Sequence, residues 1–474
     1  MQLLRNLVSL STGEVATRLI GFATFAVLAR RLEPSEYGSV ELAVALALFF
    51  AMLVDFGLGT IGTRTIARDR QQVDRLSAQI PAARLLMAVI AIPAMGGVAM
   101  AAGLPQATIN LVWLFSVGLL AVPWFQRWLF QGLEMMKLVS IGPVVRASVF
   151  CLGVVIFVQE PGDLLAVGKV EIAAAAFATL YYVTAQKLRV APVRVNFQPG
   201  ALRELFHESA SVGLSQIVWA ANQYTPAFLV GSLVGGEVMS WFGASQRIAM
   251  ALRSFSAVYH TNLFPSVSRK LVESLPTFNS LVRASYRTIA WLGILVALAA
   301  TLFAELLCRT VFGDSFGPAA QPLKVLVWTV PVTLLSGHCR AALVAGGEQK
   351  YLLYAQLGGL SITLLVGFAT IPTYGAVAGA ATMLISAVSV WMIAHAFAAR
   401  RVAAIPLLGV FRPLLVAAVL YAMHFRFAPE SQLAGLAVLA GYVVFGPLLD
   451  RSFVADARQL WETRQRQSGP PTIS

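Results

Sequence analysis

Residues 41–60 read ELAVALALFFAMLVDFGLGT, a stretch with the length and apolar character that a helix needs to cross a bilayer. Similar runs recur along the whole chain, which has 474 residues, of which 58% are hydrophobic and only 12% are charged. A soluble domain carries about 25% charged residues, so these few charges cannot cover the surface of a soluble protein of this length. The composition therefore predicts an all-α, polytopic membrane protein and excludes a soluble globular enzyme and a disordered chain.

Working outward from this run gives about 14 transmembrane helices, since each span takes about 20 mostly apolar residues. No connection between the spans is long enough to hold an extramembrane domain. The expected helices lie near residues 8–29, 41–60, 83–103, 109–129, 142–158, 164–186, 209–231, 239–262, 286–307, 322–343, 354–371, 376–398, 407–425 and 432–449.

The distribution of basic residues tests this division of the chain. The sequence has 35 Lys and Arg against 22 Asp and Glu, a net charge of +13. If the N-terminus is cytoplasmic, most basic residues fall on the cytoplasmic side, as the positive-inside rule requires. The excess of positive charge is then explained without a nucleic-acid partner, and both termini are expected in the cytoplasm. The opposite side holds Arg30, Arg31, Lys169, Arg309, Lys324 and Arg426.

An internal repeat suggests how the helices are grouped. Aligning residues 24–43 with residues 225–244 brings Glu36 onto Glu237 and Ser39 onto Ser240. Chance similarity between Ala- and Leu-rich helices is the alternative explanation. A parallel repeat predicts two six-helix lobes around a central cavity, a design found in transporters. The expected division is an N-lobe at 1–190, a C-lobe at 191–400, two extra helices at 401–450 and a cytoplasmic tail at 451–474.

Charged residues inside the spans are the first candidate site. An Arg at the centre of a membrane helix costs about 2.5–3.5 kcal/mol, so such side chains should face water or protein. Arg18, Arg247 and Arg253 lie within predicted spans, and Glu14 stands four residues before Arg18. The set is net positive and suits a phosphate or pyrophosphate, which Arg binds in bidentate fashion. A self-neutralised Glu14–Arg18 pair that only positions the helix is the alternative.

Other polar residues extend this candidate site. His260 shares a helix face with Arg253 and is a candidate proton relay. Asp55 is either a coupling group or an interfacial partner for Arg64 and Arg68. The expected helix at 209–231 carries polar side chains that either contact sugars or bond neighbouring helices, with Pro226 expected to kink it. These polar side chains are Gln216, Asn222, Gln223 and Tyr224.

Several chemistries find no support in the sequence. No GxxxxGK[ST] loop and no hydrolase motif is present, so neither ATP hydrolysis nor catalysis is expected. The cysteines Cys151, Cys308 and Cys339 have no CxxC spacing, so we expect no disulfide framework, no metal site and no cofactor. Any energy for transport would come from an ion gradient or from the gradient of the substrate.

Four segments carry a family resemblance: LARRLEPSEYG at 28–38, DFGLGTIGTRTIAR at 55–68, GASQRIAMAL at 243–252 and NLFPSVSR at 262–269. With the helix pattern, they resemble the polysaccharide transport branch of the multidrug/oligosaccharidyl-lipid/polysaccharide exporter superfamily, the O-antigen flippases of Wzx type. The resemblance extends along almost the whole chain.

This resemblance implies a flippase of the bacterial inner membrane that works by alternating access. Its substrate would be an undecaprenyl-pyrophosphate-linked oligosaccharide, moved from the cytoplasmic to the periplasmic leaflet, with membrane lipid and other polysaccharide assembly proteins as further partners. Similar lipid II flippases carry cavity arginines on their first and eighth helices, and Arg18 and Arg253 fall on those helices here, with Arg247 as a further candidate. Glu14 lies on the helix that bears a cation-binding carboxylate in multidrug exporters. A cation-coupled multidrug exporter is the alternative, and a membrane polysaccharide polymerase or ligase is a more remote one.

Overall fold

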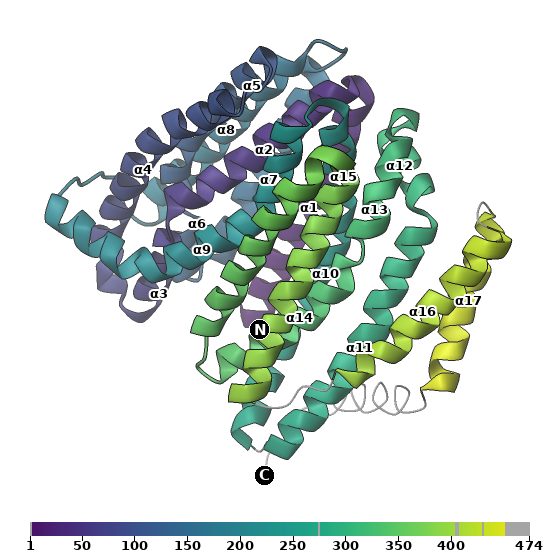
Figure 1. Cartoon of the computed structure of the whole chain (residues 1–474). Helices are drawn as coiled ribbons and strands as arrows, with labels where there is room; N and C mark the ends of the chain where they lie inside the picture. Colours follow the sequence, from purple (N-terminus) through teal and green to yellow (C-terminus); the bar gives the residue numbers. More distant parts are fainter. Residues whose placement is uncertain (1, 274, 403–406, 429–430, 451–474) are drawn as a thin grey trace. The chain divides into compact units, whose positions relative to one another are not determined.

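The computed structural model describes residues 2–273, 275–402, 407–428 and 431–450, and every regular element in these ranges is a helix. This confirms the predicted all-α class. Two compact units are present. Figure 1 labels the α-helices of both. Unit 1 comprises the described residues up to Gly243, with Val311–Phe316 and Ile371–Ala376, and unit 2 comprises the other described residues from Ala244 onward.

Unit 1 is built on three helices that lie side by side. Helix α1 packs along α7, α7 packs along α8, and α8 also contacts α5. On another side of the unit, α2 packs along α9. The helices of unit 1 are α1 (Gln2–Arg31), α2 (Pro34–Asp55), α3 (Leu58–Arg68), η1 (Arg70–Gln72), α4 (Val73–Ala101), α5 (Gln106–Val117), η2 (Gly118–Trp124), α6 (Arg127–Gly132), α7 (Met136–Phe157), α8 (Leu164–Arg189) and α9 (Pro199–Leu233).

The segment 28–38 joins the ends of several helices of unit 1. Arg31 Nη1 donates to the carbonyl oxygens of Val155 and Val158, each at 2.8 Å, and so satisfies the open C-terminus of α7. Glu36 forms a capping box at the start of α2 and also accepts the N–H of Gly162 at 3.0 Å. The residues that carry the family resemblance in this segment therefore hold the helix ends together.

Gly38 allows two helix backbones to meet. A Cβ atom at Gly38 would lie 2.4 Å from the backbone oxygen of Gly236, at the start of α10 (Gly236–Glu273). We expect Gly38→Ala to destabilise the protein by about 1–3 kcal/mol, the usual cost of overpacking. The midpoint temperature of unfolding in detergent measures this effect.

Gly97 provides the matched control for this prediction. It lies inside α4, and a Cβ atom there meets nothing within 4 Å. Gly97→Ala should be neutral or slightly stabilising, because Ala favours a helix by about 1 kcal/mol over Gly. Equal unfolding temperatures for the two variants would contradict the close packing at Gly38.

The predicted span at 41–60 is interrupted in the structure. Helix α2 ends at Asp55, Phe56 and Gly57 adopt left-handed backbone angles (φ 44° and 76°), and α3 begins at Leu58. A Cβ atom at Gly57 would lie 2.7 Å from the backbone nitrogen of Gly213 on α9. This turn therefore requires glycine, both for its backbone angle and for its contact with α9.

Unit 2 is centred on α11, which packs against α13, α14, α16 and α17. Helices α10, α12 and α15 and the short helix η3 contain residues of both units. Inside α15, Gly375 has non-helical angles (φ 54°, ψ −128°), between the predicted spans 354–371 and 376–398. The remaining helices are α11 (Leu275–Leu302), α12 (Ala304–Phe312), η3 (Asp314–Ala319), α13 (Ala320–Leu326), α14 (Thr329–Ala345), α15 (Lys350–Arg401), α16 (Leu408–Phe427) and α17 (Gln432–Leu449).

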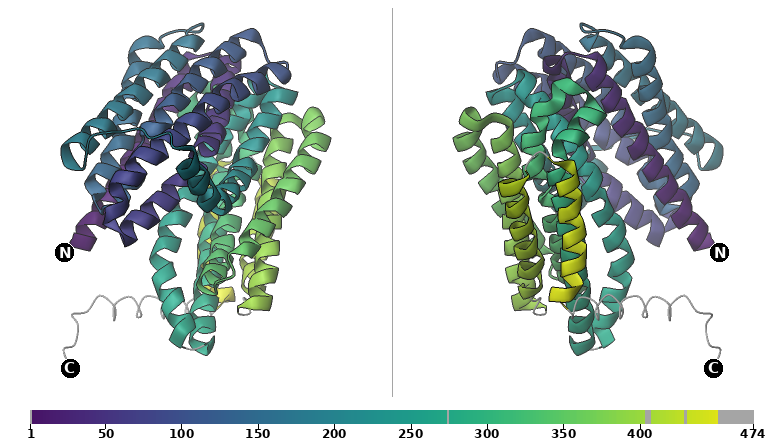
Figure 2. Two further views of the ribbon diagram at one scale, coloured as in Figure 1. Left: turned by 90° about the vertical axis from the view of Figure 1, so that its left-hand side faces the viewer. Right: turned by 90° about the vertical axis from the view of Figure 1, so that its right-hand side faces the viewer.

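A buried carboxylate links the last two helices to α11. Helices α16 and α17 lie side by side (Figure 2). Asp450 follows α17, and its side chain is only 1% exposed. Its Oδ1 lies 3.5 Å from Nη1 of Arg287 on α11 and 3.3 Å from Nη1 of Arg412 on α16. Because a buried charge needs a partner, this ion-paired group holds α16 and α17 against α11.

The helices are suited to a membrane. Among the described residues, 10 helical segments are long and apolar enough to span a bilayer. The long helices α9 and α10 are not among them. The total of about 14 spans stays a prediction.

The boundaries of the predicted lobes differ from those of the compact units. Unit 1 includes α9, because α9 packs on α2, whereas the predicted N-lobe ends at residue 190. A repeat defines lobes by sequence similarity and a compact unit is defined by packing, so the lobe boundaries remain predictions. The predicted tail at 451–474 lies outside the described residues.

Candidate functional site

Three charged side chains gather on α1 and α6. Arg18 Nη2 donates to Glu14 Oε1 at 2.7 Å, and Arg127 Nη2 lies 3.9 Å from Glu14 Oε2. Each of the three side chains is about half exposed, at 47%, 51% and 50% for Arg18, Glu14 and Arg127. We call Glu14, Arg18 and Arg127 the α1 charge cluster.

The α1 charge cluster has the composition of an anion site with an internal counterion. It joins one carboxylate to two guanidinium groups, so it is net positive. Exposure to lipid would cost several kcal/mol for each charge, and we infer that these side chains face water. An incoming phosphate would compete with Glu14 for the same guanidinium groups. The predicted pairing of Glu14 with Arg18 is present, but Arg127 was missed.

A second ion pair lies buried in unit 1. Arg84 on α4 contacts Asp55 Oδ1, which also accepts the N–H of Gly59 at 3.2 Å. Arg84 Nη1 donates to the carbonyl oxygen of Phe125 at 3.3 Å, and the Arg84 side chain is only 5% exposed. Asp55 thus pairs with Arg84, and of its two predicted roles the pairing with Arg64 and Arg68 is wrong. A carboxylate held by a buried Arg and a backbone N–H stabilises the α2–α3 turn.

A third ion pair links α7 to α8. Arg146 on α7 contacts Glu171 Oε1 on α8, and the Glu171 side chain is only 11% exposed. Arg84, Arg127 and Arg146 all lie in helical segments that are apolar enough to span a membrane. Arg18 is therefore not the only arginine among the described residues that lies in such a segment.

The polar residues of α9 have different surroundings. Gln216 Nε2 donates to Thr60 Oγ1 on α3 at 3.1 Å. Asn222 is buried, and its Nδ2 donates to the carbonyl oxygen of Val218 at 3.2 Å. Gln223 and Tyr224 are half-buried. Helix α9 continues through Pro226 to Leu233. Gln223 and Tyr224 are thus the least committed of these side chains to contacts within unit 1.

The predicted arginines of α10 belong to unit 2, and both are half-buried. Arg253 Nη2 is buried and has no hydrogen-bond partner. A guanidinium nitrogen in this state is costly unless an anion or water meets it. The Nη2 atom of Arg253 therefore needs water or an anion as a partner.

His260 on α10 lies in the core of unit 2. Its Nε2 is 3.2 Å from Nδ1 of His338 on α14, and His338 Nε2 is 3.0 Å from Ser285 Oγ on α11. His338 is buried, at 2% exposure. Among the described residues, no group of three or more His, Cys, Asp or Glu side chains is placed to hold a metal ion.

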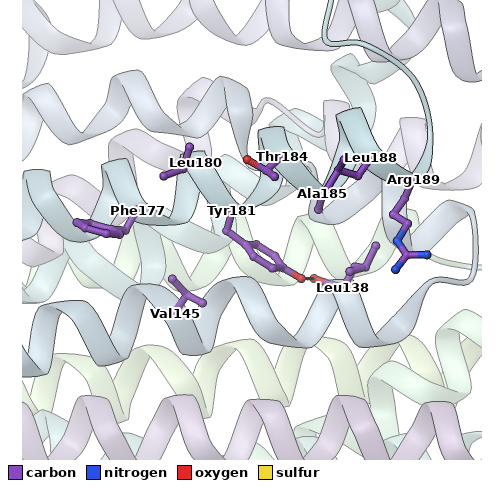
Figure 3. Close-up of a pocket in the computed structure, with 9 residues that line it drawn as sticks. All are labelled: Leu138, Val145, Phe177, Leu180, Tyr181, Thr184, Ala185, Leu188 and Arg189. Carbon is purple, nitrogen blue, oxygen red and sulfur yellow. Dashed lines mark hydrogen bonds between the residues drawn. The ribbon is translucent and has the colours of Figure 1, made fainter.

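A groove of about 450 Å³ runs between α7 and α8 (Figure 3). The hydroxyl of Tyr181 in its wall donates to the carbonyl oxygen of Leu138 at 3.2 Å. None of the predicted site residues lines this groove, and its mostly apolar wall suits hydrocarbon better than pyrophosphate. The lining residues are Leu138, Val145, Phe177, Leu180, Tyr181, Thr184, Ala185, Leu188 and Arg189.

The fold is shared with solved transporters. A lipid II flippase, MurJ, in an inward closed conformation matches with a TM-score of 0.74 and 11% identity, over 94% of this chain and 100% of that one. An inward-facing multidrug resistance MATE family transporter of the MOP superfamily matches with a TM-score of 0.64 and 13% identity, over 84% and 98%. These matches show that the chain has the fold of this superfamily.

Sequence comparison finds relatives with a shared description. A protein of Shigella dysenteriae named "Putative O-antigen transporter" is 23% identical over 381 residues, which cover 78% of this chain and 94% of that protein. A protein of Escherichia coli K12 with the same name is 20% identical over 329 residues, which cover 69% and 79%. The model of a family described as polysaccharide biosynthesis protein matches residues 3–270. That match takes in more than half of the chain and confirms the resemblance found in the sequence, so the chain belongs to the polysaccharide biosynthesis protein family.

Proposed function

We propose that this protein is a flippase that moves a polyprenyl-pyrophosphate-linked oligosaccharide from the cytoplasmic to the periplasmic leaflet by alternating access. The family, the O-antigen transporter relatives and the fold shared with a lipid II flippase support a transporter of lipid-linked glycans. The observation that carries the choice of an anionic substrate is the buried, unpartnered Nη2 of Arg253, together with the net positive α1 charge cluster.

Each part of the substrate has a proposed partner. Arg18, Arg247 and Arg253 bind the pyrophosphate, because planar guanidinium groups match its oxygens. Arg127 adds a further positive charge next to Arg18. The sugars contact polar side chains of α9, namely Gln216, Asn222, Gln223 and Tyr224. The polyprenyl chain stays in lipid. The protein lies in the bacterial inner membrane, with both termini in the cytoplasm.

Glu14 has a second role in this proposal, as the counterion that Arg18 releases when pyrophosphate arrives. Because Glu14 and the phosphate compete for the same guanidinium, loading the substrate frees a carboxylate. Asp55 is already held by Arg84 and Gly59, so its contribution is to fix the α2–α3 turn during transport.

The direct test is a strain that lacks the protein. We expect its lipid-linked glycan to accumulate on the inner leaflet and its surface polysaccharide to disappear, since the substrate is made but not moved. Extraction of labelled polyprenyl-linked glycan from spheroplasts, with and without a membrane-impermeant glycosidase, measures this accumulation. Normal surface polysaccharide in that strain would contradict the proposal.

A dye-efflux assay in the same strain separates this function from multidrug export. A drug/cation exporter needs carboxylates for a cationic substrate, whereas the charge cluster on α1 is net positive. We expect cationic dyes to leave the cells at the same rate with and without the protein. Faster efflux in its presence, combined with normal polysaccharide in its absence, would favour the multidrug alternative.

A further inference from the structure

Two histidine side chains contact each other in the core of unit 2. His260 on α10 is 5% exposed, and His338 on α14 is 2% exposed. Their ring nitrogens Nε2 and Nδ1 lie 3.2 Å apart. Gly337 makes this approach possible, because a Cβ atom there would lie 2.3 Å from the His260 ring. The glycine beside His338 thus provides the space in which the two imidazoles pair.

The hydrogen bonds around the pair fit an arrangement of protons in which both rings are neutral. His260 Nδ1–H donates to the carbonyl oxygen of Ser256 at 2.7 Å, which leaves its Nε2 as an acceptor for Nδ1–H of His338. His338 Nε2 then accepts the hydroxyl hydrogen of Ser285 at 3.0 Å. With both rings neutral, each of the four ring nitrogens has a partner.

The same network has room for one more proton. A proton taken from water can bond to His338 Nε2, while the Ser285 hydroxyl turns to accept that new N–H. The hydroxyl hydrogen of Ser285 then goes to the carbonyl oxygen of Val282, which lies 3.2 Å away. Every hydrogen bond of the pair is kept, and the charge of the network rises from zero to one. A second proton would occupy His260 Nε2, break the bond between the rings and place like charges together.

The residues around the histidine pair make its affinity for a proton depend on the conformation of the protein. Rings of Tyr259 on α10 and Tyr286 on α11 lie 5.8 and 5.6 Å from the His338 ring, and Cys339 lies in the same buried cluster on α14. Arg340 on α14 is near enough for its charge to act on His260, and His395 on α15 approaches Cys339 Sγ at 4.0 Å. These neighbours include no carboxylate. A charged pair is therefore costly in this closed core, and a conformation that admits water binds the proton better.

From this geometry we propose that the His260–His338 pair is a single-proton site that couples the transport cycle to a proton gradient. The proposal rests on the proposed function and names its coupling ion. Because proton affinity differs between a closed and an opened core, protonation shifts the balance between conformations. His338 and Ser285, which the sequence alone did not indicate, are as necessary to this site as His260.

The test uses the purified full chain in proteoliposomes with a fluorescent polyprenyl-pyrophosphate glycan. The quantity measured is the ratio of the flipping rates with and without an imposed pH gradient. We expect a ratio well above one for the wild-type protein and a ratio of one for His338→Gln. Gly337→Ala, which displaces the His260 ring, should also lower the ratio. His395→Gln is the matched control and should keep the wild-type ratio, because His395 lies outside the bonded pair.

A second measurement examines the site without transport. In a pH titration by ¹⁵N NMR of histidine-labelled protein, we expect one proton to be taken up by the pair, and this step to be absent in His338→Gln. Two independent titrations, or none, would overturn the proposal. A wild-type ratio of one would overturn it while leaving the flippase function standing. If the wild-type protein moves no glycan, the proposed function fails, and the titration alone decides whether the pair binds a proton.

Discussion

Surface polysaccharide should be lost when Arg18→Ala and Arg253→Ala are combined, while the protein remains in the membrane. Arg253 has a buried Nη2 without a partner, and Arg18 shares Glu14 with Arg127. Each charge-assisted hydrogen bond to pyrophosphate contributes about 1.5–3 kcal/mol, so removing both arginines should lower transport by about 100-fold or more. Immunoblots of surface glycan and of membrane fractions measure the two quantities in the same cells.

The control for this double variant removes the same number of positive charges elsewhere. Arg309 pairs with Glu305 at 2.9 Å near the end of α12, and Arg426 lies exposed near the end of α16. We expect Arg309→Ala combined with Arg426→Ala to preserve the glycan. If the control variant loses as much glycan as Arg18→Ala with Arg253→Ala, the loss of glycan comes from the change in net charge and not from the site. Normal glycan in the variant that combines Arg18→Ala with Arg253→Ala would refute the assignment of both arginines.

The second large effect concerns stability. Asp55→Asn leaves the Arg84 guanidinium buried, at 5% exposure, without its carboxylate partner. Removing one member of a buried ion pair typically costs about 3–5 kcal/mol. Because Asp55 also accepts the Gly59 N–H, the α2–α3 turn should loosen as well. The midpoint temperature of unfolding of the detergent-solubilised protein should fall markedly.

Two further variants show whether this effect belongs to the pair. Combining Asp55→Leu with Arg84→Met removes both charges, so it should destabilise less than Asp55→Asn does alone. Asp69→Asn is a control, because the Asp69 carboxylate is only partly buried and caps η1 by accepting the N–H of Gln71. The hydrogen bonds from Gln72 and Gln71 lower the pKa of Asp69, but it neutralises no buried charge. Equal unfolding temperatures for Asp55→Asn and the wild type would contradict a structural role for the ion pair.

Features that depend on one helix could be predicted from the sequence. Glu14 and Arg18 are four residues apart, so helix geometry alone brings them together, as the structure confirms. The interruption of α15 at Gly375 was expected from the two apolar runs on either side of it. The all-α class followed from composition, because a chain with so few charges has to bury its surface in lipid.

Contacts between distant parts of the chain were not predictable in the same way. Arg84 lies on α4, and nothing in the sequence shows that it reaches Asp55 at the end of α2. Arg127 begins α6 after η2 ends at Trp124, and an apolar run does not reveal this break. The pairing of His338 with His260 depends on the packing of α10 on α14 at Gly337. A single sequence carries no information on which of many polar residues meet in space.

The most direct measurement of the flippase account is glycolipid movement in a purified system. Proteoliposomes containing the wild-type chain and a fluorescent polyprenyl-pyrophosphate glycan are treated with dithionite, which quenches only the outer leaflet. We predict that quenching becomes complete with the wild-type protein and stops near half with protein-free vesicles or with Arg18→Ala combined with Arg253→Ala. Quenching that stops near half with the wild-type protein, or that is complete with the double variant, would contradict the claim that these arginines carry the pyrophosphate across.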